Sequence, residues 1–258
     1  MAFKLSDISV SRRDKPPIIT IYGPPGIGKT SFAAQAPNPV FIQCEEGEGI
    51  LPINSFPVIK TFDQIIEAFG VLVQEDHGFR TAVVDTTSSL EPLIWNHACR
   101  VNNKSSIEDF GYGKGYIEAM EYWNMLVSAT KILRDKGMIV ILLAHSDIIR
   151  LDPPDNEPYD RYQIKLHKRA FQLLYEQSDI IGFANNKPYI KKVKEGQKES
   201  RQAIQMEGRM LNLVEKPAFI AKNRYDLPEQ IPFPKEGSWD ELAKAMHETA
   251  PQINLSGD

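Results

Sequence analysis

Short apolar runs alternate along the first part of the chain with stretches whose apolar residues recur at helical spacing. The runs predict buried strands over residues 17–22, 39–44 and 81–85, and the amphipathic stretches predict helices over 62–74 and 89–100. Strands that alternate in this way with helices are typical of an α/β fold. We therefore expect a central sheet with helices packed against it.

The second half of the chain contains two long polar segments. Residues 102–115 are polar and glycine-rich and predict a mobile loop, which a long helix follows. Residues 138–144 are all apolar and predict a core strand with no solvated face, which favours a mostly parallel sheet. The segment 145–162 contains DPPDNEP and predicts a second long loop without regular structure. Antiparallel strands at the edge of the sheet are expected over 188–193, 202–206 and 217–221.

We expect three regions along the chain. Residues 1–16 form an N-terminal extension, 17–228 form the core, and 229–258 form an acidic C-terminal tail with a short helix. The core is predicted to hold a mostly parallel central sheet with helices on both faces and an antiparallel C-terminal edge.

Composition excludes several classes of protein. The chain has 258 residues, of which 42% are hydrophobic and 9% aromatic, so it can bury a sizeable core. No apolar run approaches the roughly 18 residues of a membrane helix, and the N-terminal residues carry charges where a signal peptide would be apolar. Cys44 and Cys99 are too few for a disulfide framework or a zinc cluster. We expect a cytoplasmic protein with no membrane partner.

One segment matches a phosphate-binding motif. Residues 23–30 read GPPGIGKT, which fits G-x-x-x-x-G-K-[S/T], and they lie between a predicted strand and a predicted helix. Glycines allow successive backbone amides to curl around phosphates. Lys29 would reach the β- and γ-phosphates, and the Thr30 hydroxyl would bind Mg²⁺. The sequence thus predicts binding of ATP and Mg²⁺ by Gly23, Pro24, Pro25, Gly26, Ile27, Gly28, Lys29, Thr30 and Ser31.

Asp85 is the candidate for a second magnesium-binding group. It ends the apolar run of the strand at 81–85, where P-loop proteins place the acid that holds the metal. Taken alone, an Asp in this position more often ends a strand or caps a helix. Thr86 follows it where many motor ATPases have Glu, so the base that activates water must come from another segment.

Two other side chains are candidates for a place near the γ-phosphate. Glu45 follows the second predicted strand, where a carboxylate could orient the attacking water. The alternative is a solvated acidic turn, because Glu46 and Glu48 continue the run of charge. His145 ends the core strand at 138–144 and could sense the phosphate, although a His in this position is often only structural.

These segments together resemble the RecA-type ATPase core, and in particular the short RecA-like ATPases of phages that are known as recombination or nucleotide-binding proteins. The resemblance rests on the phosphate loop, on FIQCEE at 41–46, on AVVD at 82–85 and on AKNRYDLP at 221–228. It implies a RecA-like P-loop NTPase fold, with Glu45 as the catalytic carboxylate. His145 departs from the Gln that is typical of bacterial RecA.

The resemblance also implies an oligomer. In RecA-type filaments two basic residues separated by one position reach the ATP of the neighbouring subunit, and Lys222 and Arg224 match that pattern. An ordinary basic edge strand is the alternative. The implied partners are further copies of the chain in a ring or a filament, single-stranded DNA, and a single-strand-binding or other replication protein, in the cytoplasm of the host if a phage encodes the protein. The resemblance implies handling of single-stranded DNA of the annealing or recombinase type. Because its span leaves no room for a large DNA-binding domain, the implication narrows to ATP-linked binding or annealing of single strands.

The uneven distribution of charge along the chain is compatible with binding of nucleic acid. The chain has a net charge of -4, yet residues 131–224 carry 18 basic and 12 acidic side chains. Basic groups contact phosphates and aromatic rings stack on unpaired bases. A solvated basic hairpin explains the same pattern. The candidate contacts to DNA are Arg161, Lys165, Lys168, Lys191, Lys192 and Lys194.

Two other classes of function stay open at this point. A P-loop phosphotransferase would need an arginine-bearing lid, which the segment 145–169 could supply. A nucleotide-gated scaffold or a helicase loader would use the same loops to bind protein.

Overall fold

The computed structural model describes residues 14–46, 51–154, 157–195 and 198–253, together with Lys4 and Leu255. For residues 187–207 the description covers the backbone alone. Within these ranges, no helix combines the length and the apolar character that a membrane span requires.

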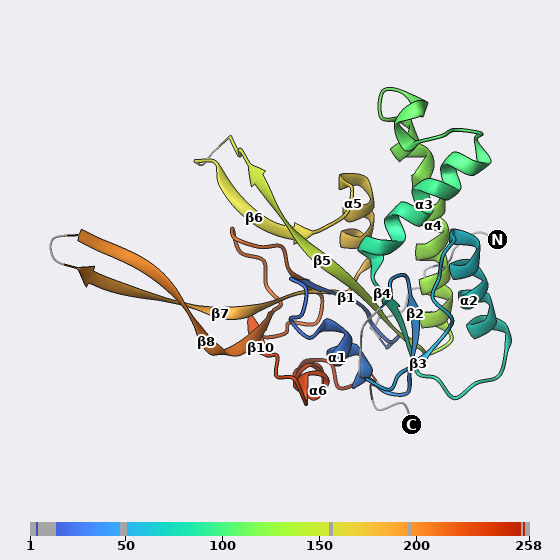
Figure 1. Cartoon of the computed structure of the whole chain (residues 1–258). Helices are drawn as coiled ribbons and strands as arrows, with labels where there is room; N and C mark the ends of the chain where they lie inside the picture. Colours follow the sequence, from blue (N-terminus) through green and yellow to red (C-terminus); the bar gives the residue numbers. More distant parts are fainter. Residues whose placement is uncertain are drawn as a thin grey trace.

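One mixed sheet organises the chain, with its strands in the order β10-β8-β7-β1-β5-β4-β2-β3 (Figure 1). The six strands from β7 to β3 are parallel, and β8 and β10 continue the sheet with antiparallel pairing. This confirms the mostly parallel sheet and its antiparallel C-terminal edge. The strands are β1 Ile18–Gly23, β2 Pro39–Gln43, β3 Asn54–Ser55, β4 Thr81–Asp85, β5 Ile139–Leu151, β6 Tyr159–Ile164, β7 Ile180–Glu195, β8 Lys198–Asn212, β9 Lys222–Asn223 and β10 Gln230–Pro232.

Helices cover both faces of the sheet, as predicted (Figure 1). One face packs against α2, α3, α4 and α5, and the opposite face packs against α1 and α6. The helices are α1 Lys29–Ala34, α2 Phe62–Gln74, α3 Thr87–Val101, α4 Lys114–Asp135, α5 Lys168–Gln177 and α6 Ser238–Thr249, with a short 3₁₀ helix η2 at Ile107–Phe110.

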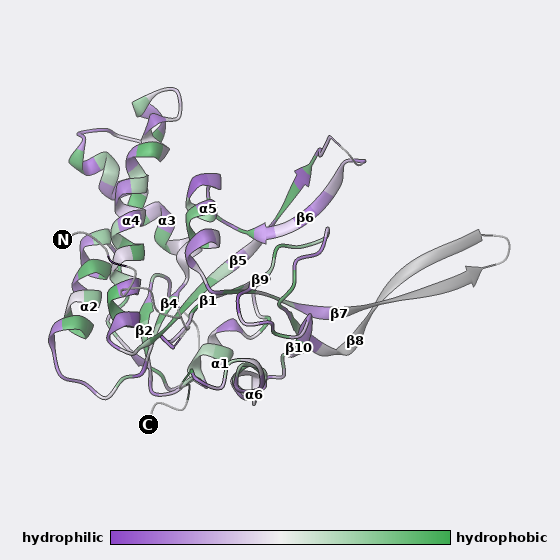
Figure 2. Ribbon diagram, turned by 180° about the vertical axis from the view of Figure 1, so that it is seen from behind, coloured by the Kyte–Doolittle hydropathy of each residue, from purple (hydrophilic) through white to green (hydrophobic). Residues whose placement is uncertain are grey.

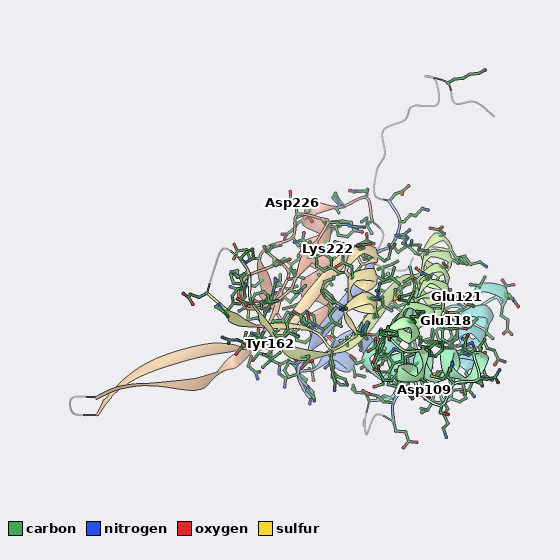
Figure 3. All side chains as sticks on the ribbon, turned by 90° about the horizontal axis from the view of Figure 1, so that it is seen from above. Asp109, Glu118, Glu121, Tyr162, Lys222 and Asp226 are labelled. Carbon is green, nitrogen blue, oxygen red and sulfur yellow. The ribbon has the colours of Figure 1, made fainter. Side chains whose placement is uncertain are left out.

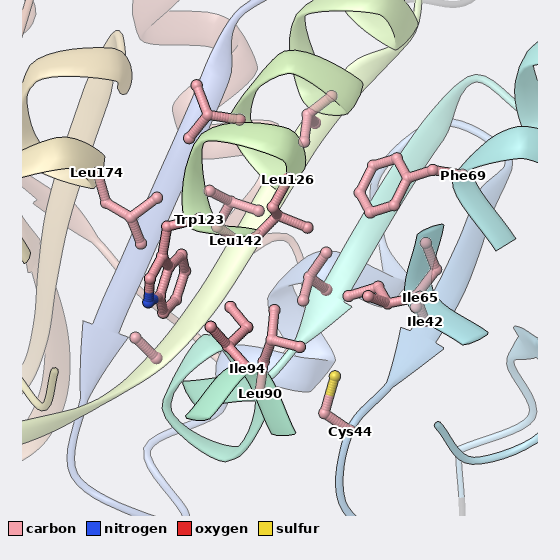
Figure 4. Close-up of a cluster of buried hydrophobic side chains, with 14 of the residues drawn as sticks. Ile42, Cys44, Ile65, Phe69, Leu90, Ile94, Trp123, Leu126, Leu142 and Leu174 are labelled. Atoms are coloured by element: carbon pink, nitrogen blue, oxygen red, sulfur yellow. The ribbon is translucent and has the colours of Figure 1, made fainter. Parts of the chain in front are cut away.

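Alternation along the buried strands divides the core in two. Successive side chains of a strand point to opposite faces of the sheet, so Ile42 and Leu142 pack under the layer of α2 to α5, where Trp123 and Leu126 of α4 meet them (Figure 4). Their neighbour Ile141 belongs to the cluster under α1 and α6. In Figure 2 the central strands are coloured as hydrophobic, whereas β6 and α5 carry more hydrophilic residues. Burial of every strand position explains why these runs show no polar alternation.

The expectation of an irregular loop over 145–162 is wrong. Strand β5 continues through His145 to Leu151 and pairs antiparallel with β6, from Ser146 opposite Ile164 to Leu151 opposite Tyr159. Regular structure therefore reaches as far as Leu151 and resumes at Tyr159. The residues on either side of the proline-rich segment are polar and have no strong preference for a strand. They form strands because β5 and β6 pair with each other and satisfy each other's backbone hydrogen bonds.

Two further segments differ from expectation. The stretch 102–115 contains η2, whose first turn is closed by a reciprocal capping box between Ser106 and Asp109. The expected strand over 217–221 is absent from this described stretch, and the strand β9 begins at Lys222 instead.

In the predicted tail, the ring of Trp239 on α6 packs 5.6 Å from that of Phe32 on α1, so α6 is part of the core.

Candidate functional site

The carboxyl ends of four parallel strands bring the candidate residues to one edge of the sheet. Gly23 at the end of β1 lies opposite His145 of β5, and Gln43 at the end of β2 lies opposite Asp85 of β4. Glu45 follows β2 by two residues. In open α/β sheets this edge is where ligands bind. The topology thus gathers the phosphate loop, Asp85, Glu45 and His145 as the sequence predicts.

The phosphate loop joins β1 to α1 and depends on its glycines. Gly26 and Gly28 have φ angles of 73° and 107°, which lie in the left-handed region that other residues rarely adopt. Gly28 is the residue that precedes α1, and its carbonyl accepts a hydrogen bond of 2.9 Å from the amide of Phe32. The loop therefore has the open, backbone-lined shape that a chain of phosphates requires.

Lys29 is folded onto the loop that precedes it. Its ammonium group donates to the carbonyls of Gly23 at 3.0 Å and Pro24 at 3.1 Å, and the side chain is buried. Burial lowers the pKa of Lys29, whereas the carboxylates of Asp85 and Glu45 act in the opposite direction. Phosphate oxygens would be stronger acceptors for this ammonium group than the two carbonyls.

Thr30 and Asp85 offer an oxygen pair suited to Mg²⁺. The Thr30 hydroxyl donates to Asp85 Oδ2 at 2.8 Å, and burial raises the pKa of Asp85. A buried carboxylate without a cation is costly, and Mg²⁺ prefers hydroxyl and carboxylate oxygens together with phosphate and water. The described residues contain no group of three or more His, Cys, Asp and Glu side chains that could hold a metal ion alone, so the remaining ligands would come from nucleotide and water.

Glu45 is held by two neighbours. The Ser89 hydroxyl donates a hydrogen bond to Glu45 Oε2, and His145 Nε2 lies 3.5 Å from the same oxygen. The Glu45 side chain is 39% exposed, which leaves it accessible to water. The backbone of His145 is fixed as well, because its amide donates to the Ser88 hydroxyl at 3.0 Å. The arrangement can orient a carboxylate towards a water molecule at the open edge of the site.

Sequence reasoning missed Ser88 and Ser89. Both follow Asp85 in the run Thr86 to Ser89, at the start of α3. Four consecutive hydroxyl residues after the acid of a P-loop protein were a signal, since hydroxyls at the start of a helix can point back towards the strand end. The partner of Ser89 was not predictable from this signal, because Glu45 lies 44 positions away.

Lys222 and Arg224 lie at the opposite edge of the sheet. Strand β9 pairs with the amino end of β7, where Ile180 is also opposite Ile19 at the start of β1. Lys222 Nζ donates to the carbonyl of Tyr175 at 2.6 Å, and Arg224 donates to the carbonyl of Glu176 at 2.7 Å and to Asp179 Oδ1 at 3.1 Å. Both cations therefore bind the C-terminal end of α5 in their own subunit. Their action on a neighbouring subunit stays a prediction.

The candidate DNA contacts separate into three groups. Arg161 is used inside the protein, contrary to expectation: its guanidinium pairs with Glu215 and donates to the carbonyl of Phe219 at 3.3 Å, and its side chain is only 13% exposed. Lys165 and Lys168, at the end of β6 and the start of α5, are exposed. The side chains of Lys191, Lys192 and Lys194 lie outside the described residues.

Comparisons with known proteins agree with this geometry. A family model described as an AAA domain matches residues 15–225. The chain is also 24% identical over 220 residues to the SPbeta prophage-derived uncharacterized protein YorG of Bacillus subtilis (strain 168). That alignment covers 81% of this chain and 59% of the relative, so the chain spans less than two thirds of that protein.

Proposed function

Because the chain belongs to the AAA domain family of P-loop ATPases, we propose that it binds and hydrolyses ATP with Mg²⁺ and couples the nucleotide to the handling of single-stranded DNA in phage recombination or replication. The observation that supports binding and hydrolysis of ATP is the convergence of four side chains at one edge of the sheet: Lys29, Thr30, Asp85 and Glu45. The similarity to a prophage-derived protein supports the phage context.

Each side chain has a role in this proposal. Lys29 and the loop amides bind the phosphates, exchanging the carbonyls that Lys29 contacts for phosphate oxygens. Thr30 and Asp85 hold Mg²⁺, which neutralises phosphate charge when bound. Glu45 orients the attacking water, and Ser89 and His145 keep its carboxylate in place.

The proposed DNA surface is the β5–β6 hairpin together with the start of α5. Lys165 and Lys168 are exposed there, and Tyr162 is 40% exposed, which leaves ring surface for a base. The neighbouring α3–α4 unit carries Asp109, Glu118 and Glu121 (Figure 3), together with the exposed Lys104 and Lys114. Lys191, Lys192 and Lys194 of the β7–β8 hairpin are further candidates from the sequence.

ATP turnover with and without single-stranded DNA, measured over a range of salt concentrations, tests both parts. We expect DNA to stimulate turnover, and the stimulation to fade as salt rises because phosphate contacts release counterions. Calorimetry with MgATP measures the affinity for nucleotide, and Lys29→Ala is the control. No binding by the wild type would overturn the proposal; turnover indifferent to DNA would favour a nucleotide-gated scaffold or a helicase loader.

The oligomer remains part of the proposal, with Lys222 and Arg224 completing a neighbour's site. Mixing Lys29→Ala subunits with Lys222→Ala/Arg224→Ala subunits should restore partial turnover, since each mixture then contains intact composite sites. Because both cations bind the end of α5, the double variant must first show a wild-type unfolding midpoint. No recovery at any ratio of folded subunits would leave the two residues with a purely structural role.

A further inference from the structure

The two strands of the β7–β8 hairpin contact the phosphate loop. A Cβ atom on Gly23, where the loop begins, would lie 2.4 Å from the carbonyl oxygen of Ala184 in β7. A Cβ atom on Gly28, where the loop ends, would lie 3.0 Å from Arg209 Nη1 in β8. The base of the hairpin therefore contacts both ends of the loop, and the contact of Gly23 with the Ala184 backbone leaves no space for a larger residue.

Arg209 makes a polar contact between the hairpin and the phosphate loop. Its Nη1 donates a hydrogen bond of 3.0 Å to the carbonyl of Ile27, a residue 182 positions away. The backbone of Arg209 is fixed from the other side, because its carbonyl accepts from the amide of Phe233 at 2.8 Å. The Phe233 ring packs 5.5 Å from that of Phe32 on α1. Arg209 thus joins the loop to the helix that follows it.

The bond to Ile27 controls the direction of a loop amide. The carbonyl of Ile27 and the N–H of Gly28 belong to one planar trans peptide and point in opposite directions. Because Arg209 binds the carbonyl, the Gly28 N–H points away from the guanidinium. Backbone amides of such a loop bind phosphate.

Arg209 also lies at the point where the hairpin changes its pairing. Asn186 pairs with Arg209, but the next regular pair joins Pro188 to Gln205, so β8 carries extra residues at this bulge. Gly208, beside Arg209, has a φ angle of 157°. A bulge bends the strand that contains it, and in Figure 1 the outer parts of β7 and β8 extend away from the body of the molecule.

We propose that Arg209 is the positioning residue of the phosphate loop, and that through it the base of the β7–β8 hairpin sets the affinity for nucleotide. The inference rests on the proposed nucleotide binding. It assigns Arg209 no contact with the nucleotide, because the observed contact is to a backbone carbonyl of the loop. Since the loop amides hold both di- and triphosphates, Arg209 should affect MgADP and MgATP alike.

The test replaces Arg209 in the full chain and measures affinity for MgATP and MgADP by calorimetry. Arg209→Met keeps the apolar stem but removes the donor, and should weaken both affinities about tenfold, the effect expected for a hydrogen bond from a charged group. Arg209→Lys can donate to the same carbonyl and should stay within about threefold of wild type. Lys216→Ala, which removes an exposed cation paired with Glu229, is the matched control and should bind as wild type.

The outcomes are distinct. Equal weakening of MgATP and MgADP by Arg209→Met, a raised KM with little change in kcat, and rescue by Arg209→Lys would support the inference. Unchanged affinity in a folded Arg209→Met protein would overturn it. A loss confined to MgATP or to kcat would also overturn it, in favour of direct contact with the γ-phosphate. Failure of the wild type to bind either nucleotide would instead remove the proposed function itself.

Discussion

The hydroxyl of Thr30 donates a hydrogen bond of 2.8 Å to Asp85 Oδ2 across 55 positions of sequence. Thr30 lies in the first turn of α1, which follows β1, and Asp85 lies at the end of β4. Strand β5 lies between β1 and β4 in the sheet. Their contact shows that the phosphate loop and the acid at the strand end form one site. The same two oxygens can bind Mg²⁺.

Thr30→Val should separate metal binding from nucleotide binding. Valine keeps the shape of threonine but lacks the hydroxyl, so the affinity for MgATP should fall about tenfold, while the weaker binding of ATP without metal stays unchanged. Thr30→Ser retains the hydroxyl and serves as the matched control. Titrations with and without Mg²⁺ measure the difference; an equal loss in both would show that Thr30 does not act through the metal.

Glu45→Gln should retain ATP binding and lose turnover. The amide cannot act as a base, so kcat should fall about 100-fold or more. Ser89→Ala removes the hydrogen bond that orients Glu45 and should lower kcat about tenfold with the affinity for ATP unchanged. Steady-state hydrolysis with parallel binding measurements checks both variants. Wild-type turnover in Glu45→Gln would assign the base to another residue.

Gly23→Ala should destabilise the fold. The new methyl group would lie 2.4 Å from the carbonyl oxygen of Ala184, and relief of this overlap should cost about 1–3 kcal/mol of the free energy of unfolding. Gly70→Ala is the control, because no atom lies within 4 Å of its added methyl group, and alanine in a helix interior should stabilise by about 0.5–1 kcal/mol. Denaturant titrations measure both. Equal stability of Gly23→Ala and wild type would contradict the close packing of β1 against β7.

Stability should depend on pH through Glu91. Both carboxylate oxygens of Glu91 lie 3.0 Å from the amide of His167, and burial raises the pKa of Glu91 to about 7 from the ordinary 4.5. Between these two values the folded protein keeps a proton that the unfolded chain has released. The free energy of unfolding should therefore fall as pH rises from about 4.5 to 7, by up to about 3 kcal/mol, and then level off.

Glu91→Gln provides the control for this pH dependence. Glutamine cannot ionise, so the variant should lack the fall in stability that the wild type shows across this window. Unfolding measured at several pH values in both proteins gives the comparison. Parallel curves would mean that other groups cause the dependence.

The parts of the molecule that local physics controls could be predicted from the residues alone. The phosphate loop is identified by glycines and a Lys-Thr pair at fixed spacing, and the buried strands by uninterrupted apolar runs that no solvated strand would carry. The placement of Asp85, Glu45 and His145 at one edge followed as well, because the carboxyl ends of parallel strands lie on the same side of a sheet.

The contacts between distant segments became visible only in the folded chain. The sequence around Arg161 does not differ from that of a surface arginine, and only the approach of Glu215 and the carbonyl of Phe219 draws it inside. The strand after His145 forms because β6 supplies its hydrogen bonds. Arg209 reaches Ile27 because β7 and β8 bring it beside β1. Such contacts carry no local signal, since pairing and burial depend on what the rest of the chain places nearby.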